Sequence, residues 1–326
     1  MKNKLVTGHL PAIITILIWG TTFVASKILL DVFSPIEVLF MRFILGYAAL
    51  CLASVPELLS AKKKSNPKPK FAWRQEIYFA AAGLMGVTVY FLMENTALTF
   101  STASNVGILV AVSPLFAAIL SGLFLREEKL GRRFFIGFGV AMAGIILVSL
   151  NGNFVLKLNP TGDLLAVAAA FAWAVYSILQ KKIQPFGYSV VVLTRKCFFY
   201  GLVFMIPFMI GMGFNPDMTA LMKPSILFPI LYLGLGASAI CYATWNFALH
   251  ALGPVKVSVY IYLIPFVGIV FAGIILHEKI TWAALAGVGL ILAGLYLSEN
   301  SFGKAKTGAE PLPVPVAVDE DSSDPL

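Results

Sequence analysis

Long apolar stretches separated by short polar ones follow each other along almost the whole chain. A hydrocarbon core about 30 Å thick requires roughly 20 apolar residues for each helical crossing, and ten segments meet this requirement. They lie at residues 9–30, 36–55, 77–98, 103–125, 132–150, 161–180, 188–212, 225–249, 255–276 and 281–298. None of them alternates apolar and polar positions with a period of two, as the strands of a membrane β-barrel do. The pattern therefore predicts an all-α polytopic membrane protein with ten transmembrane helices.

The second half of the chain repeats the first at a nearly fixed distance. Gly83, Asn95, Ala97, Leu98 and Pro114 recur 151 residues later as Gly234, Asn246, Ala248, Leu249 and Pro265, and Glu128, Lys129, Gly137 and Gly144 recur 150 residues later as Glu278, Lys279, Gly287 and Gly294. So many shared positions indicate a duplication. Because five crossings are an odd number, the second copy enters the membrane upside down, which predicts inverted repeats of the kind found in secondary transporters.

The repeat also sets the predicted domain boundaries. Residues 1–150 and 151–298 are expected to form one five-helix repeat each. Residues 299–326 lack the apolar pattern and are rich in proline and acidic side chains, which predicts a disordered cytoplasmic tail.

Composition narrows the class of protein. Hydrophobic residues make up 59% of the chain and charged residues 12%, far from the average of soluble proteins. The sequence contains no Walker loop, GxSxG elbow, HExxH pair or dinucleotide fingerprint, so we expect neither an enzyme nor a cofactor. The three Cys and three His are scattered along the chain, and their spacing predicts no metal site.

The net charge of +8 reflects topology rather than a nucleic-acid partner. With the N-terminus in the cytoplasm, 17 of the 24 Lys and Arg lie on the cytoplasmic side, whereas Lys157, Lys223 and Lys279 lie outside. This asymmetry obeys the positive-inside rule. It predicts a multi-pass protein of the cytoplasmic membrane with both termini inside and the lipid bilayer as a partner.

Several motifs occur together in a fixed order. They are Trp19-Gly20-Thr21-Thr22-Phe23, Arg42-Phe43, the run from Asn95 through Pro114, and in each half a Glu-Lys pair followed nine residues after the Glu by Gly. In this order they resemble the EamA family of the drug/metabolite transporter superfamily, over roughly residues 9–298. The resemblance implies an inverted-repeat carrier with helices one, three, four, six, eight and nine around a central cavity. It also implies export of amino acids or other small metabolites, and it assigns no substrate-binding residue.

Glu94 is the carboxylate that lies well within a predicted cavity-facing segment. An ionisable group in the membrane costs about 2.5 to 3.5 kcal/mol on insertion scales, which makes it a functional candidate. Glu94 either lines the cavity and binds protons or a cationic group of the substrate, or it belongs to a structural ion network at the outer mouth with Arg42 or Lys27.

The cations within the segments have simpler expected roles. Lys27 precedes Asp31 by four residues, a spacing that predicts a local ion pair on one helix face. Arg42, Arg195 and Lys196 stand about two turns into their segments and are expected to extend toward the membrane interface.

The remaining candidates are aromatic, amide and proline residues. The substrate-site candidates besides Glu94 are Trp19, Tyr90, Asn95, Trp173, Tyr176, Trp245, Asn246 and Tyr262. The aromatic side chains either face the cavity or anchor the protein at the interface, and the amides either join helices or act as gates. Pro114 and Pro265 are hinge candidates expected to free a backbone carbonyl in mid-segment, or are kinks that only shape packing.

The leading hypothesis is a secondary transporter that exports or exchanges small metabolites such as amino acids by alternating access. A proton-coupled multidrug exporter with Glu94 as the proton site is one alternative, and a non-transporting membrane sensor or scaffold that signals through its tail is another. A small-molecule solute is the expected partner, and protons are a candidate coupling ion. Substrate identity, direction and oligomeric state are left open by the sequence.

Overall fold

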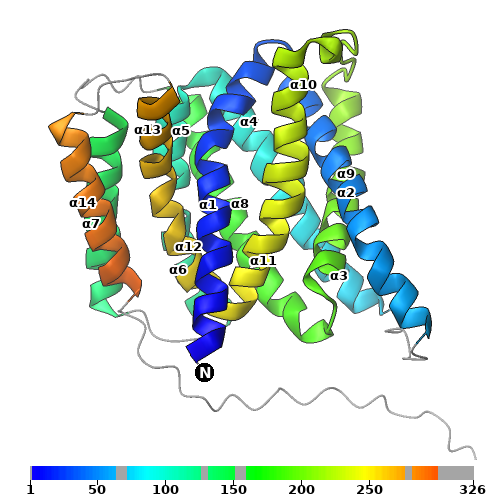
Figure 1. Ribbon diagram of the computed structural model, residues 1–326, viewed down its shortest axis with the longest axis horizontal. Coiled ribbons are helices and arrows are strands. Elements are labelled where there is room, and N and C mark those ends of the chain that lie inside the picture. Colours follow the sequence, from blue (N-terminus) through cyan, green and yellow to red (C-terminus); the bar gives the residue numbers. More distant parts are fainter. Residues whose placement is uncertain (1, 64–71, 126–130, 151–158, 276–280, 300–326) are drawn as a thin grey trace, which may run out of the picture.

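The computed structural model describes residues 2–63, 72–125, 131–150, 159–275 and 281–299, and within these ranges every regular element is a helix, arranged in one bundle (Figure 1). The α-helices are α1 (Lys2–Leu30), α2 (Pro35–Lys63), α3 (Trp73–Gly83), α4 (Tyr90–Phe100), α5 (Ala103–Val110), α6 (Ser113–Phe124), α7 (Arg132–Leu150), α8 (Pro160–Ile183), α9 (Val190–Gly211), α10 (Pro224–Leu231), α11 (Cys241–Leu252), α12 (Pro254–Ser258), α13 (Ile264–Ile275) and α14 (Trp282–Glu299). Short π or 3₁₀ segments are η1 (Leu84–Val89), η2 (Gln184–Phe186), η3 (Ala220–Met222), η4 (Tyr232–Ile240) and η5 (Val259–Leu263). The all-helical prediction is confirmed.

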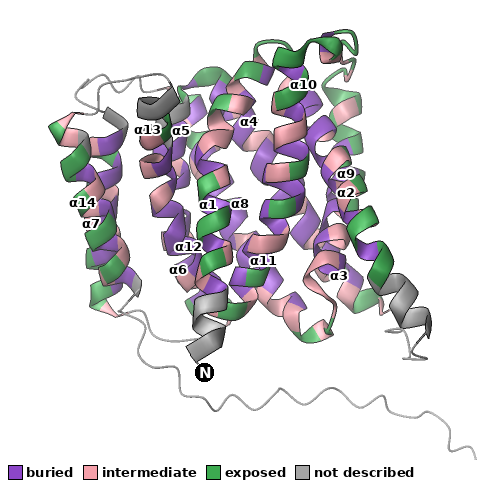
Figure 2. Ribbon diagram, in the orientation of Figure 1, coloured by how far each residue is buried: buried purple, intermediate pink, exposed green. Residues whose placement is uncertain are grey.

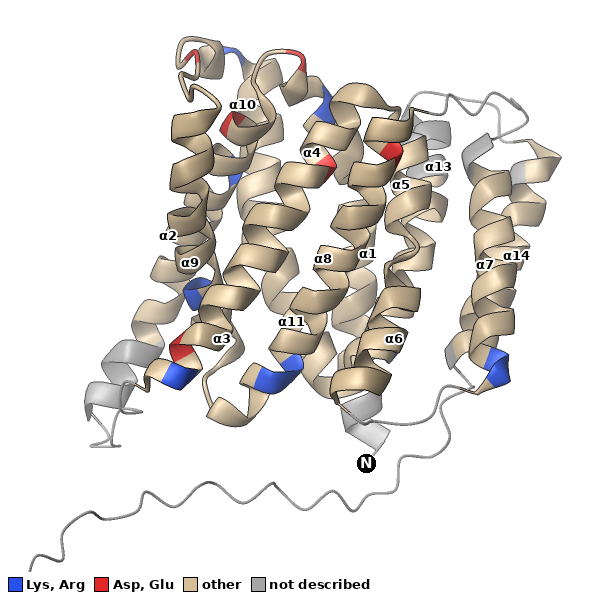
Figure 3. Cartoon of the chain, turned by 180° about the vertical axis from the view of Figure 1, so that it is seen from behind, with Lys and Arg blue, Asp and Glu red and all other residues tan. Residues whose placement is uncertain are grey.

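The bundle has the surface of a membrane protein. Seven helices in the described ranges are long and apolar enough to cross a membrane, and shorter apolar helices lie at 254–267 and 285–298. Buried residues line the centre and many exposed ones face outward (Figure 2), including Leu52 at 75% and Leu164 at 71% exposure. Lys, Arg, Asp and Glu lie mostly toward the two ends of the bundle (Figure 3). Such large exposed apolar side chains are stable where lipid rather than water covers them.

Two long helices contain a π segment at matching positions. The helix from Trp73 to Phe100 is interrupted by η1, and the helix from Pro224 to Leu252 by η4. A π turn changes the backbone hydrogen-bonding pattern and is frequent at functional sites. Gly86 O in η1 accepts a hydrogen bond from Tyr242 OH at 2.5 Å, and Ala237 O in η4 accepts one from Trp19 Nε1 at 3.0 Å. Gly86 and Ala237 are 151 residues apart, the distance of the repeat.

The proline candidates open new helices. Residues 111–112 separate α5 from α6, and the 3₁₀ segment η5 separates α12 from α13. Pro114 and Pro265 are the second residues of α6 and α13. In the first turn of a helix the missing N–H of proline breaks no intrahelical hydrogen bond. The expectation that each proline frees a carbonyl within a continuous helix is therefore wrong.

Helices α7 and α14 form a tightly packed pair at one side of the bundle (Figure 1). A Cβ atom placed on Gly137 would lie 2.8 Å from Gly294 O, and one on Gly144 would lie 2.6 Å from Gly287 O. The contacts pair an early residue of α7 with a late residue of α14, so the helices are antiparallel. Small residues allow such close backbone approach between membrane helices.

Candidate functional site

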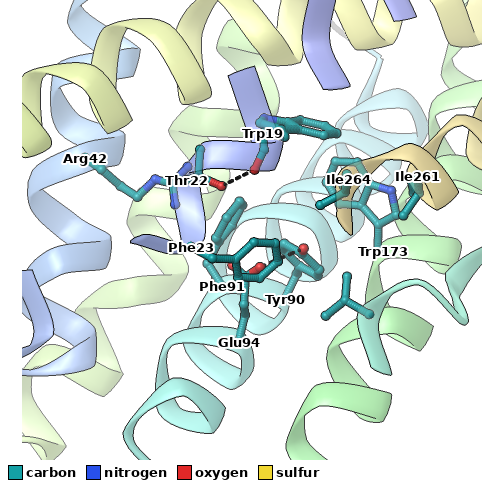
Figure 4. A pocket seen from close by; sticks show the side chains of 11 residues that line it. Trp19, Thr22, Phe23, Arg42, Tyr90, Phe91, Glu94, Trp173, Ile261 and Ile264 are labelled. Atoms are coloured by element: carbon teal, nitrogen blue, oxygen red, sulfur yellow. Dashed lines mark hydrogen bonds between the residues drawn. The ribbon is translucent and has the colours of Figure 1, made fainter. Parts of the chain in front are cut away.

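A pocket lies in the middle of the bundle, between α1, α2, α4, α5, α8 and the η5–α13 region (Figure 4). Its walls are formed by Trp19, Thr22, Phe23, Arg42, Tyr90, Phe91, Glu94, Val110, Trp173, Ile261 and Ile264. The volume of this cavity is about 30 Å³, which is enough for about two water molecules. Any larger molecule would require these side chains to move apart.

Aromatic rings pack closely around this pocket. The rings of Trp19 and Trp173 meet edge to face with centroids 5.3 Å apart, and Tyr90 lies 5.1 Å from Trp173. The ring centroid of Trp245, which is not part of the lining, lies 5.1 Å from that of Trp19. Trp19 Nε1 donates to Ala237 O, whereas Trp173 Nε1 is buried with no acceptor among the described residues. An unpaired buried donor is costly, so the two tryptophans are in unequal environments.

Glu94 and Tyr90 share one face of α4 because they are four residues apart. The Tyr90 hydroxyl donates to Glu94 Oε1 at 3.1 Å, and the Glu94 side chain points into the pocket wall (Figure 4). Glu94 is 7% exposed, so its carboxyl group is held in an apolar setting with a single hydroxyl as hydrogen-bond donor among the described residues.

Arg42 enters the same pocket from α2. It is 1% exposed, so the expectation that Arg42 extends to the interface is wrong. Its Nε donates to Ser238 Oγ at 3.0 Å, and its guanidinium carbon lies 4.2 Å from the centroid of the Phe91 ring, a cation–π geometry. Among the described residues, Arg42 and Glu94 form no direct ion pair with each other or with a third group. The pocket therefore contains one cation and one carboxylate, both without a charged partner in contact.

Among the described residues, Glu94 forms no contact ion pair with Arg42 or Lys27, so the ion network expected at the outer mouth does not form around it. Lys27 Nζ donates to Leu98 O at 2.6 Å and makes no ion pair with Asp31 in the described part of the chain, so the predicted pair is wrong. Glu37 accepts hydrogen bonds from the backbone N–H groups of Ser34 at 2.8 Å and Asn215 at 3.0 Å. Lys27 and Glu37 are thus engaged with the backbone rather than with Glu94.

Five of the predicted site residues lie outside the pocket lining: Asn95, Tyr176, Trp245, Asn246 and Tyr262. Asn95 Nδ2 contacts Pro35 O at 3.4 Å. Asn246 accepts from Tyr176 OH at 2.9 Å and donates to Thr194 Oγ1 at 2.9 Å, which joins α8, α9 and α11. These are helix-to-helix hydrogen bonds of the kind expected for buried amides.

Tyr262 is separated from the central pocket. It lies in η5, and its ring is 6.5 Å from that of Phe138 in α7. Of the predicted residues, the structure brings Trp19, Tyr90, Glu94 and Trp173 together at the pocket wall.

Sequence reasoning missed Arg42 as a pocket residue, as well as the apolar side chains that line the pocket. It also missed Tyr242, which is fully buried and contacts Trp19, Trp173, Phe91 and other rings. One signal was present in the chain: Tyr242 follows Phe91 by 151 residues, the distance of the repeat.

Comparison with known proteins places the chain among transporters. The model of the EamA-like transporter family matches residues 6–150 and 160–299. An "Uncharacterized transporter" of Archaeoglobus fulgidus is 32% identical over 292 residues, covering 89% of this chain and 96% of that protein. A "Probable amino-acid metabolite efflux pump" of Escherichia coli K12 is 26% identical, covering 90% and 94% of the two chains, and a "Probable terminal-alkyne amino-acid exporter" of Streptantibioticus cattleyicolor is 25% identical, covering 92% and 96%. A solved crystal structure with 20% identity has the same fold, with a TM-score of 0.72 over 92% of this chain and 99% of that one.

Proposed function

The chain belongs to the EamA-like transporter family and is a multi-pass membrane transporter, and from this premise we propose that it exports amino-acid-type metabolites across the cytoplasmic membrane. Both termini face the cytoplasm in this proposal, because that orientation places most Lys and Arg inside. The names of the Escherichia coli and Streptantibioticus cattleyicolor relatives support the substrate class and the direction.

The observation that carries the proposal is the presence of Arg42 and Glu94 in one buried pocket without an ion pair between them. Two buried charges that make no ion-pair contact are unfavourable in an apolar interior. A zwitterionic amino acid supplies the complement of both, with its carboxylate on the Arg42 guanidinium and its ammonium on Glu94. The guanidinium is suited to a carboxylate because its planar fork offers parallel donors. The aromatic walls then favour substrates with an apolar side chain.

The same charges argue against a multidrug exporter. A lipophilic cation would find Glu94 and aromatic rings, but it would also meet the buried cation Arg42. Like charges in an apolar pocket repel strongly. We therefore place the zwitterionic substrate ahead of a cationic one. Proton binding at Glu94 remains compatible with the proposal, since a proton and a substrate ammonium would compete for the carboxylate.

Alternating access would arise from the inverted repeats. The contacts that support this arrangement link matching positions of the two halves: Gly137 packs on Gly294, and Gly144 packs on Gly287. Helix α1 packs on η4 as α8 packs on η1. An internal two-fold relation of this kind lets each half take the conformation of the other. The narrow pocket fits a closed form of the site, which substrate entry would widen.

Pro114 and Pro265 are proposed as hinges in this cycle. Each is separated by one residue from an irregular stretch of backbone, residues 111–112 or η5, where a change of φ and ψ needs no break of a regular helix. Hinges commonly lie at such element ends. The tail at residues 299–326, which the scaffold alternative requires, lies outside the described residues except for Glu299.

The proposal is tested with purified protein in liposomes. We expect uptake of labelled leucine or phenylalanine, weaker competition by leucinamide, which lacks the carboxylate, and weaker competition by N-acetyl-leucine, which lacks the ammonium. A charge-assisted hydrogen bond contributes about 1.5–3 kcal/mol, so each loss should weaken competition roughly 10- to 100-fold.

Two matched variants test which charged group of the substrate each residue binds. Arg42→Gln should reduce the preference for leucine over leucinamide and leave the preference over N-acetyl-leucine, and Glu94→Gln should do the converse. Transport by the wild type should fall as the pH is lowered, because protonation of Glu94 removes the partner of the ammonium, and Glu94→Gln should lose this dependence. Equal competition by all three compounds would contradict the zwitterion site, and absence of any amino-acid transport would contradict the proposed function.

A further inference from the structure

A second cavity lies at the side of the bundle, toward the end that holds the N-terminus. It is formed between α2, α3 and α9, and its volume is about 290 Å³. Tyr47 and Cys51 of α2, Glu76 of α3, and Arg195, Lys196, Phe199 and Tyr200 of α9 line it. None of these residues belongs to the central pocket, and the transport proposal uses none of them.

The charges in this cavity do not balance. Glu76 pairs with Lys196 and also accepts a hydrogen bond from Tyr200 OH at 2.7 Å. Arg195 is left without a carboxylate: among the described residues its only hydrogen-bond acceptor is Ser54 Oγ, which accepts from Nη1 at 2.5 Å. The cavity therefore has one net positive charge, with guanidinium donors to spare.

The surroundings of the cation are apolar and face outward. Arg195, Phe199 and Val203 follow each other at four-residue spacing on one face of α9, and Phe199 is 47% and Val203 42% exposed. Across from them, Tyr47 of α2 packs on Phe199 with ring centroids 6.3 Å apart, and Ile44 is 41% exposed. The Arg195 guanidinium thus lies at one end of an apolar strip formed by Phe199, Val203 and Ile44, which continues toward the middle of the membrane.

The depth of the cation matches the head-group layer. Arg195 lies five residues after the start of α9 at Val190, or about 8 Å along the axis at 1.5 Å per residue. The interfacial layer on each side of the hydrocarbon core is roughly 5–8 Å thick. If α9 enters this layer at Val190, the Cα of Arg195 lies at the inner edge of the layer, and its long side chain can extend back toward the lipid phosphates, with Phe199 and Val203 at the level of acyl chains.

From this arrangement we propose that the cavity binds an anionic phospholipid, with its phosphate on Arg195 and an acyl chain along Phe199, Val203 and Ile44. Basic pockets between membrane helices are known to accept acidic head groups, and the guanidinium fork suits a phosphate. Because α2 belongs to the first half of the chain and α9 to the second, the bound lipid joins the two halves.

Lipid-dependent stability tests the site. Delipidated full-length protein in detergent is melted with added phosphatidylglycerol, with phosphatidylcholine, and with inorganic phosphate at the same phosphorus concentration. We expect phosphatidylglycerol to raise the melting temperature by several degrees more than either of the others. Native mass spectrometry of the same samples should show a retained phosphatidylglycerol.

Charge-matched variants locate the effect. Arg195→Gln keeps a donor for Ser54 but removes the charge, and it should lose both the selective stabilisation and one retained lipid. Arg74→Gln removes an exposed cation at the same end of the bundle, outside the cavity, and should behave as the wild type. An unchanged lipid response in Arg195→Gln would overturn the proposal, and so would an equal response to inorganic phosphate, which would indicate a site for the free ion. Neither readout requires transport, so a failure of the lipid proposal can be distinguished from a failure of the proposed substrate.

Discussion

If the proposed alternating access operates, we predict that Trp19→Phe and Trp173→Phe shift the balance between the two access states in opposite directions. Trp19 and Trp173 occupy matching places in the two halves, and so do the carbonyls of Ala237 and Gly86. In the structure Trp19 Nε1 donates to Ala237 O, but Gly86 O accepts from Tyr242 OH and Trp173 Nε1 has no acceptor. If the halves exchange conformations, Trp173 acquires Gly86 O in the other state and Trp19 loses Ala237 O.

The magnitude follows from one hydrogen bond. Both substitutions keep an aromatic ring and remove an indole N–H, so their packing effects are similar. Trp19→Phe removes a bond of 3.0 Å from the present state, a loss of about 1 kcal/mol, which changes the ratio of the two states about fivefold. Trp173→Phe removes a donor that is unpaired here and is expected to be paired in the other state. It should therefore favour the present state by a similar or larger factor.

Accessibility from the two sides of the membrane measures this ratio. Thr22 lines the central pocket, so a Thr22→Cys protein with the three native cysteines replaced reports access to it. Labelling by an impermeant maleimide is compared in intact cells and in inverted vesicles. We expect the ratio of the two labelling rates to change in opposite directions in the Trp19→Phe and Trp173→Phe backgrounds.

Two results would refute this reasoning. A shift of the ratio in the same direction for both variants would mean that the tryptophans act only through packing. No shift in either variant, with transport intact, would mean that the indole hydrogen bonds do not differ between the access states.

Two further predictions concern the glycine contacts and the prolines. Gly144→Val should push α14 away, since its Cβ would lie 2.6 Å from Gly287 O, and should destabilise the protein by about 1–3 kcal/mol. A Cβ at Gly139 on the same helix meets nothing within 4 Å, so Gly139→Val should melt as the wild type. Equal melting temperatures of the two variants in detergent would contradict the close contact. Pro114→Ala and Pro265→Ala should slow turnover in liposomes more than they weaken equilibrium substrate binding, because a hinge acts on interconversion, and unchanged turnover in both would leave the prolines with a packing role only.

The sequence predicted the helical segments well because a membrane span needs a long apolar run, which is visible without any tertiary information. It also identified Trp19, Tyr90, Glu94 and Trp173, which meet at the pocket. These residues carry polar atoms on segments that the family resemblance placed around the cavity. The residue type and the segment were enough to select four side chains that line one pocket, and their part in substrate binding stays a prediction.

The direction of the charged side chains was not predictable in the same way. Arg42 was expected at the interface because its depth along the segment allowed it, but the rotation of α2 turns it inward onto Phe91 and Ser238. Lys27 was expected to pair with Asp31, yet a carbonyl from another helix, that of Leu98, lies within reach. Both outcomes depend on which neighbour packs on the helix, and helix spacing alone contains no such information.

The π segments also left no trace in the composition of the sequence. Leu84–Val89 and Tyr232–Ile240 consist of ordinary apolar and small residues. A close tertiary contact lies directly before η1, where a Cβ placed on Gly83 would lie 2.4 Å from Cys197 O of α9. The two segments end 151 residues apart, at Val89 and Ile240, which is the distance of the repeat.

The glycine crossing of α7 and α14 has a consequence for how the two copies of the repeat can diverge. Each close contact takes one glycine from each copy, and the two contacts use the same two repeat positions in exchanged order. A larger side chain at one of these positions in one copy therefore clashes with the backbone of the other copy. Mutational drift at these positions is coupled across the halves, and a single five-helix unit with these glycines would present a surface that fits an inverted second unit.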